Sequence, residues 1–173
     1  FGQLPHTLRV VSGARIDNAR AVEDGLVEIQ DAASQIASSL VDAQPGMTVI
    51  DLCAGAGGKT LAMAAAMNGT GRLIACDVDH RRLERLKPRA DRARAFNVVV
   101  KELRHDWLDR PATEAFTETA ERVLVDAPCS GSGTWRRNPE TKWRLTPEKL
   151  SGYTAMQSRL LDRAATLVAP GGR

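Results

Sequence analysis

Short apolar runs bounded by turn-forming residues recur along the chain, and they predict strands. These runs lie at 25–30, 47–52, 71–76, 97–103 and 122–125. The residues before the first run have many turn formers and weak periodicity, so they predict an irregular or hairpin approach. The later runs are richer in Val, Ile and Leu, as expected for strands buried on both faces.

The stretches between these runs carry apolar residues at helical spacing. One helix is predicted after Asp31 as its N-cap, and a second, almost wholly apolar one over 61–67. A basic helix follows Asp77, and Pro88 is expected to interrupt it because proline removes an amide donor. The last helix starts at Thr146-Pro147-Glu148, where a hydroxyl cap, a proline and an acid coincide, and reaches about residue 169.

Strands that alternate with helices imply a doubly wound, mainly parallel α/β sheet. The order of elements divides the chain into an approach segment with a short strand at 1–30 and an α/β domain at 31–173. In such a sheet another strand should follow Arg173, so we expect the domain to be truncated at its C-terminal side.

Composition narrows the class of protein without identifying it. The 173 residues, 43% hydrophobic and 26% charged, suit one soluble domain. No apolar run approaches the roughly 18–20 residues of a membrane span, and the opening FGQLPHTLRV does not resemble a signal peptide, so we expect a cytoplasmic protein without a membrane partner. The three cysteines and three histidines show no metal-ligand or disulfide spacing, and no metal is predicted.

Positive charge is unevenly distributed along the chain. The net charge is only +3, yet 11 of the 24 Lys and Arg residues lie within 79–94 and 134–144. The second stretch mixes cations with two tryptophans, a combination suited to phosphates and stacked bases. We predict nucleic-acid contacts there for Trp135, Arg136, Arg137, Lys142 and Trp143, and of the two tryptophans we expect Trp143 rather than Trp135 to be the one that packs against the sheet.

A glycine-rich turn after the second predicted strand is the candidate cofactor site. Glycines at 55–58 would let a ligand approach the backbone closely. The turn is not a Walker A loop, because the first glycine of that motif would fall at Cys53. Asp77 lies about twenty residues beyond the glycines, where a ribose-binding acid is found in dinucleotide folds.

Carboxylates at the strand ends favour a cationic ligand. Asp51, Asp77, Asp106 and Asp126 all end or follow predicted strands. They would repel a pyrophosphate, whereas S-adenosylmethionine brings a sulfonium and an ammonium. We therefore expect Asp77 to hold the ribose, Asp106 the adenine amino group and the 55–58 backbone the methionine part. Cys53 and Cys76 are expected to pack as small hydrophobes.

The loop DAPCSGSG carries the candidate chemistry. A thiol at Cys129 could act as a nucleophile if its surroundings favour the thiolate. Pyrimidine C5 is a poor nucleophile, and thiolate addition at C6 would activate it, while Asp126 could bond the base edge. Methylation of an amino group needs no such adduct, and its familiar Asn/Asp-Pro-Pro-aromatic loop is absent from this sequence.

Four separated motifs carry a family resemblance. VEIQDAASQ, DLCAGAGGKT, CDVD and LVDAPCSGSGTWRRNPETKW resemble the bacterial Sun/Nop (RsmB-like) RNA cytosine-5 methyltransferases over about 23–173. The resemblance implies a class I methyltransferase fold, S-adenosylmethionine as cofactor, and ribosomal RNA or else transfer RNA as partner. It also implies cofactor contacts from Cys53, Ala54, Gly55, Ala56, Gly57, Gly58, Lys59, Asp77, Asp106 and Asp126. Gly55-Ala56 replaces the Ala-Pro of many members, which should leave backbone contacts intact.

The resemblance also changes the role of Cys129. Family members use two cysteines: the one in the Pro-Cys motif assists release of methylated RNA, and the nucleophile follows a Thr on the next strand, beyond Arg173. We therefore expect residues 31–173 to bind cofactor without methylating. The alternatives are a noncatalytic nucleic-acid-binding module that retains the cofactor fold and, third, a nucleotide-dependent oxidoreductase. Lys59 is expected to anchor the glycine turn or Asp126.

Overall fold

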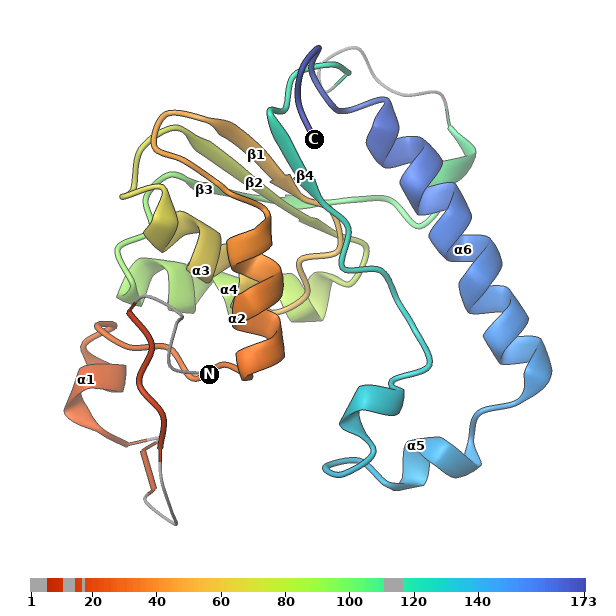
Figure 1. The fold of residues 1–173 in the computed structure, drawn as a ribbon, viewed down its shortest axis with the longest axis horizontal. Coiled ribbons are helices and arrows are strands. Elements are labelled where there is room, and N and C mark those ends of the chain that lie inside the picture. Colours follow the sequence, from red (N-terminus) through yellow and green to blue (C-terminus); the bar gives the residue numbers. More distant parts are fainter. Residues whose placement is uncertain (1–5, 11–14, 17, 111–116) are drawn as a thin grey trace.

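A four-stranded parallel sheet forms the centre of the molecule (Figure 1). The computed structural model describes residues 6–10, 15–16, 18–110 and 117–173. Its strands are β1 (Thr48–Asp51), β2 (Arg72–Asp77), β3 (Val98–Glu102) and β4 (Arg122–Leu124). They are arranged in the order β3-β2-β1-β4, and every neighbouring pair is parallel. The predicted doubly wound, parallel α/β sheet is therefore confirmed.

Helices precede, connect and follow these strands. They are α1 (Arg20–Glu23), α2 (Ala32–Leu40), α3 (Gly58–Ala66), α4 (His80–Arg92), α5 (Glu140–Trp143) and α6 (Pro147–Ala165), with short 3₁₀ turns η1 (Trp107–Asp109) and η2 (Ser132–Thr134). Thr146 caps α6 as predicted, and its hydroxyl accepts a hydrogen bond from the Lys149 amide at 3.3 Å. No helix among the described residues is long and apolar enough to cross a bilayer.

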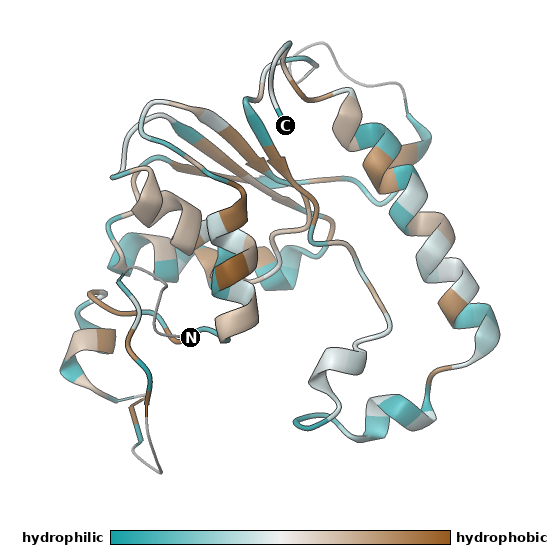
Figure 2. Ribbon diagram, in the orientation of Figure 1, coloured by the Kyte–Doolittle hydropathy of each residue, from teal (hydrophilic) through white to brown (hydrophobic). Residues whose placement is uncertain are grey.

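Alternate residues of the strands bury their side chains on opposite faces of the sheet. Val49 and Leu73 pack with Met63 and Met67 of the α3 region, and Ala75 with residues of α3 and α4. Ile50 and Ile74 pack on the other face against Leu160, Ala164 and Leu167. Figure 2 shows the apolar strands between these helical layers. Burial on both faces explains the continuous apolar runs that predicted the strands.

Three sequence predictions were wrong in detail. Residues 25–30 form no strand; after α1, the amides of Leu26 and Val27 instead donate to the Ala21 carbonyl. Pro88 does not interrupt α4, which continues to Arg92 because Leu83, Leu86 and Ala90 bury one face of the helix. Burial of that face outweighs the hydrogen bond lost at proline. Trp143 does not pack on the sheet; it is 82% exposed.

The outer edge of β4 is paired with the end of the chain. Ala120 and Val168 form a parallel bridge. Further along, the Arg173 amide donates to the Glu121 carbonyl, and the Val123 amide donates to the Arg173 carbonyl, at 2.9 and 2.8 Å. Those two hydrogen bonds are the pattern that a parallel strand makes with its neighbour. Arg173 thus lies in register for a strand beside β4.

Candidate functional site

A cleft of about 430 Å³ lies at the point where the strand order reverses. The chain leaves β1 toward α3 on one face of the sheet and leaves β4 toward α6 on the other, which is where ligands bind in open α/β sheets. Its size is within the range of ligand pockets. The cleft is lined by Ile29, Gln30, Asp31, Ser34, Asp51, Cys53, Ala54, Ala56, Gly58, Lys59, Arg82, Arg89, Asp126 and Arg137.

The glycine turn between β1 and α3 forms one wall of this cleft. Gly57 caps α3 with φ +82°, and a Cβ there would lie 2.1 Å from Leu86 Cδ1. Gly55 also has a positive φ, and a Cβ there would lie 2.6 Å from the Arg82 guanidinium. Both positions therefore favour glycine for backbone conformation, and at Gly57 the buried Leu86 side chain also leaves no space for a Cβ. Cys53, Ala54, Ala56, Gly58 and Lys59 line the cleft, whereas Gly55 and Gly57 lie outside its lining. The cofactor contacts of these residues stay predictions.

Asp77 holds the glycine turn in place from beneath. Its side chain is buried, with Oδ2 accepting from the Gly55 amide at 2.7 Å and Oδ1 from the Asp79 amide at 2.9 Å. Asp77 lies outside the residues that line the cleft. The structure therefore shows a loop-anchoring role for Asp77, and its contact with a ribose stays a prediction.

Asp51 is a buried carboxylate at the base of the cleft. The Thr60 hydroxyl donates to its Oδ2 at 2.6 Å, while its Oδ1 has no hydrogen-bond partner among the described residues. Burial raises the pKa of the Asp51 carboxyl to about 6, and the nearby negative charge of Asp126 adds to this effect. A cationic ligand group would relieve both the missing partner and the buried charge.

Lys59 and Asp126 join the two halves of the cleft. The Lys59 ammonium lies 2.6 Å from Asp126 Oδ2, and the lysine is mostly buried while the aspartate is about half exposed. This pair links the start of α3 to the loop after β4. The predicted anchoring of Asp126 by Lys59 is confirmed.

The three cysteines have different surroundings. Cys76 is in the core, and Cys53 packs beside it, as predicted. Burial raises the pKa of both thiols to about 12, so both are protonated at neutral pH. Cys129 is exposed on the loop after β4, and the Gln157 amide on α6 donates to the neighbouring Pro128 carbonyl at 2.9 Å. The accessible thiol is thus the one on the Pro-Cys loop.

Asp106 is engaged away from the cleft lining. Arg104 and Arg110 each lie 3.0 Å from its carboxylate oxygens. Hydrogen bonds from these guanidinium groups lower the pKa of Asp106 to about 2. In this arrangement Asp106 faces two arginines, and its predicted contact with adenine stays untested.

Several contacts in and beside the cleft escaped sequence reasoning. Glu28 binds both Arg89, at 2.9 Å, and Arg92, and Arg89 also donates to the Ala56 carbonyl of the glycine turn. Asp31 forms an ion pair with Arg137 at 2.6 Å. Glu28 and Asp31 belong to the VEIQDAASQ motif, which was the one available signal, but no sequence rule gave its residues a structural partner.

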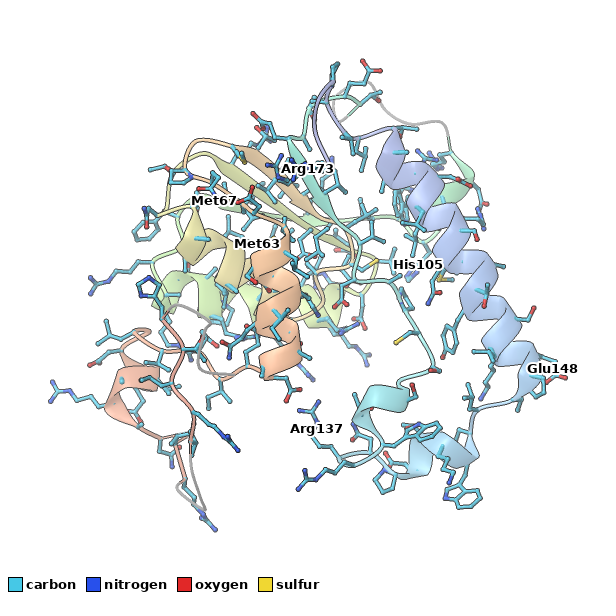
Figure 3. The ribbon with its side chains drawn as sticks, viewed as in Figure 1. Met63, Met67, His105, Arg137, Glu148 and Arg173 are labelled. Atoms are coloured by element: carbon cyan, nitrogen blue, oxygen red, sulfur yellow. The ribbon has the colours of Figure 1, made fainter. Side chains whose placement is uncertain are left out.

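Residues 130–145, hereafter called the RNA-facing segment after the nucleic-acid contacts predicted for its residues, lie apart from the sheet (Figures 1 and 3). Neither η2 nor α5 buries a residue. The Lys142 ammonium lies 5.9 Å from the Trp135 ring centroid and 5.3 Å from that of Trp143. Trp135 is half-buried, whereas Arg136, Arg137 and Lys142 are exposed. Of the predicted nucleic-acid residues, only Arg137 also lines the cleft.

A glycine-turn cleft at the switch point of a parallel sheet is Rossmann-like, and the solved structures that share this fold make it a class I methyltransferase fold. The model of the 16S rRNA methyltransferase RsmB/F family matches residues 38–173. The chain belongs to the RsmB/F family of 16S rRNA methyltransferases, which confirms the resemblance found in its motifs.

Named relatives and solved structures agree with this assignment. The chain is 34% identical over 171 residues to a probable ribosomal RNA small subunit methyltransferase B of Synechocystis, covering 98% of this chain and 37% of that protein. It is 39% identical over 143 residues to ribosomal RNA small subunit methyltransferase B of Thermus thermophilus, covering 83% and 33%. The chain thus spans about a third of the length of these relatives.

Two solved structures share the fold. A methyltransferase homologue from Pyrococcus horikoshii has a TM-score of 0.77 and 30% identity, covering 93% of this chain and 48% of its own. NSun6 from Pyrococcus horikoshii, solved with the S-adenosylmethionine analogue SFG, also has a TM-score of 0.77, at 23% identity and covering 90% and 38%.

S-adenosylmethionine is the cofactor of this family and of these structural neighbours, and the cleft residues fit it. The unpartnered Asp51 Oδ1 is an acceptor for a cationic group. The glycines of the turn have no side chains, so the ligand could approach the backbone closely there. Arg82 supplies a cation in the cleft for the carboxylate of an amino-acid ligand.

Proposed function

We propose that this chain is the cofactor-binding part of an RNA cytosine-5 methyltransferase that acts on ribosomal RNA. The observation that carries the proposal is the position of the Pro-Cys loop. It leaves β4 at the edge of the cofactor cleft, and the Lys59–Asp126 ion pair ties its first residue to the glycine turn. This supports a role for Asp126, which lines the cleft, and for Cys129, three residues further along the loop, beside the target base and the methyl donor.

The residues of the chain have separate roles in this proposal. The glycine turn and Asp51 hold the cofactor, which supplies an electrophilic methyl group when bound. Asp77 contributes by fixing the turn. Asp126, held by Lys59, bonds the edge of the cytosine and helps to activate the ring. Cys129 assists the release of methylated RNA from the covalent adduct.

The nucleophile in this scheme belongs to a strand beyond Arg173. The two hydrogen bonds between Arg173 and β4 support the place of that strand, at the outer edge of β4 and beside the Pro-Cys loop. A thiolate there would add to C6, and the electrons gained at C5 would attack the methyl group. Removal of the C5 proton by a base would then expel the thiolate and restore the ring. We accordingly propose that residues 1–173 bind cofactor but do not methylate.

The RNA-facing segment supplies the RNA-binding surface in the proposal. Arg136, Arg137 and Lys142 would contact phosphates, and Trp135 with the exposed Trp143 would stack on unpaired bases. Ribosomal RNA is favoured over transfer RNA because both named relatives are ribosomal RNA small subunit methyltransferases.

The sharpest test uses a protein extended to the length of its relatives. Cys129→Ser should retain the covalent RNA adduct, seen as a denaturation-resistant complex, and should lose turnover of methyl label. Ser130→Ala is the matched control because it removes a hydroxyl from the same loop. Turnover without adduct in Cys129→Ser would contradict the role of Cys129. Label in a position other than cytosine C5 would contradict the proposed reaction.

Calorimetry on the 173-residue chain tests the cofactor separately. We expect S-adenosylmethionine to bind and NAD not to bind, which would distinguish the methyltransferase from a nucleotide-dependent oxidoreductase. Binding of S-adenosylmethionine without methylation by the extended protein would favour a noncatalytic RNA-binding module.

A further inference from the structure

An ion pair joins the RNA-facing segment to the cofactor cleft. Arg137 Nη2 lies 2.6 Å from Asp31 Oδ2, and both residues line the cleft. Figure 3 shows the Arg137 side chain reaching from the segment toward the start of α2. Asp31 occupies the N-cap position of α2 but makes no side-chain capping hydrogen bond. Its carboxylate is engaged with the segment instead of with its own helix.

The surroundings of this ion pair allow another anion to replace Asp31 as the partner of Arg137. The Arg137 and Asp31 side chains are 60% and 53% exposed, so water and salt screen their attraction. Neither η2 nor α5 contributes a buried side chain that would hold the segment to the core. A guanidinium binds phosphate with the same forked geometry as carboxylate. An RNA phosphate is therefore a direct competitor of Asp31 for Arg137.

We propose that Asp31 holds Arg137 as a latch over the cofactor cleft, and that an RNA phosphate opens this latch by binding Arg137. Asp31 would thereby set the affinity for both S-adenosylmethionine and RNA. While the pair is formed, Arg137 is part of the cleft wall and helps to enclose the cofactor. Once a phosphate takes Arg137, that part of the wall moves away and the cofactor is held less tightly. The inference rests on the RNA-binding role of the segment proposed above.

Such a latch makes the two ligands antagonistic. RNA must lower the affinity for S-adenosylmethionine by the same factor as S-adenosylmethionine lowers the affinity for RNA, because the coupling is reciprocal. An exposed ion pair supports a coupling of about two- to fivefold. Antagonism of that size would still allow both ligands to bind together.

Asp31→Asn separates a latch from a purely structural contact. Asparagine keeps the size of the side chain but releases Arg137. We expect the 173-residue chain to bind a labelled single-stranded RNA about two- to fivefold more tightly by fluorescence anisotropy. It should bind S-adenosylmethionine about two- to fivefold more weakly by calorimetry, and the antagonism should disappear.

Asp24→Asn is the matched control for net charge. Asp24 is also 53% exposed and also pairs with an arginine, Arg20, but it lies outside the cleft lining. It should change neither the cofactor affinity nor the antagonism. The exchanged double variant Asp31→Arg with Arg137→Asp should restore cofactor affinity while RNA affinity falls below that of the unmodified chain.

The possible results separate this inference from the proposed function. Weaker binding of both ligands by Asp31→Asn, or affinities equal to those of Asp24→Asn, would overturn the latch alone. A chain that binds S-adenosylmethionine but no RNA would refute the RNA-binding role of the segment, and the latch with it.

Discussion

The glycine-turn cleft and the RNA-facing segment are built in opposite ways. The cleft is fixed from below by Asp77, from the side by the Glu28–Arg89–Ala56 contacts, and across its mouth by the Lys59–Asp126 pair. The segment has no buried residue in η2 or α5, and Trp143 is 82% exposed. Figure 2 shows the same division, with apolar strands in the sheet and a hydrophilic α5.

This difference separates two tasks. A methyl donor is a small ligand, and a preorganised pocket binds it without the cost of ordering loops. RNA presents a repeating charge and mobile single-stranded bases, which an exposed and adaptable surface can follow. Apart from the Asp31–Arg137 pair, which belongs to both regions, substitutions in the cleft should therefore change stability and cofactor affinity together, whereas substitutions in the segment should change RNA affinity alone.

Gly57→Ala should have the largest effect and would test how rigid the cleft is. The new Cβ would lie 2.1 Å from Leu86 Cδ1 at a residue with φ +82°. We expect a loss of about 2–4 kcal/mol in the free energy of unfolding, together with loss of cofactor binding. Gly46→Ala is the control, since Gly46 has φ +86° but no atom within 4 Å of its Cβ position. Equal losses in urea unfolding would mean that the contact with Leu86 costs nothing.

Asp51 gives the cleft a pH dependence that the segment should lack. Burial raises the folded-state pKa of Asp51 from 3.8 to about 6, so the folded state binds a proton more tightly than the unfolded state. The contribution of this group to stability is therefore complete below about pH 4 and is lost as pH rises through 6. It amounts to about 3 kcal/mol. The difference in unfolding free energy between the unmodified chain and Asp51→Asn should shift by this amount between pH 3.5 and 7.

A constant stability difference between these two proteins across that range would show that Asp51 does not titrate as a buried carboxyl. Thr60→Val is a useful companion because it removes the hydroxyl that donates to Asp51 at 2.6 Å. Loss of that hydrogen bond should raise the pKa of Asp51 further and move the transition to higher pH.

Glu28→Gln tests whether the residues before α2 support the cleft. Glu28 is about a quarter exposed and binds Arg89 and Arg92, so its neutralisation leaves two partly buried guanidinium groups without a carboxylate. We expect a loss of about 1–2 kcal/mol in the free energy of unfolding and weaker cofactor binding, because Arg89 also holds Ala56. Glu23→Gln is the control at an exposed position nearby. An unchanged cofactor affinity would limit Glu28 to a structural role.

Sequence reasoning succeeded where the pattern was local. Apolar runs located all four strands of the sheet, and the Thr146 cap located the start of α6, because each depends on neighbouring residues. Sequence reasoning failed where contacts between residues far apart in the chain determine the local structure. The run at 25–30 has the apolar content of a strand but no strand beside it to pair with, and Pro88 is tolerated because α4 is held by its buried face.

In the candidate site, too, the features set by local sequence were predicted and those set by distant contacts were not. The glycine turn and the Asp126–Cys129 loop were recognisable because their spacing along the chain is part of their chemistry. The pairing of Asp31 with Arg137 joins residues 106 positions apart, and nothing in either local sequence specifies it. The exposure of Trp143 was also beyond a local pattern, since a tryptophan between polar residues fits either a packed or a stacking role.

Trp143→Leu should have the smallest effect on stability and gives the sharpest contrast with the cleft. Because the ring is 82% exposed, the free energy of unfolding should change by less than about 0.5 kcal/mol. Affinity for single-stranded RNA should fall about five- to tenfold, since leucine cannot stack on a base. Trp143→Phe should keep most of the affinity. The dependence of binding on salt should stay unchanged in both, because no phosphate contact is lost, whereas Arg136→Gln should reduce it. A Trp143→Leu chain that is destabilised while binding RNA normally would assign this ring to packing, and the contrast between cleft and segment would then fail at its most exposed residue.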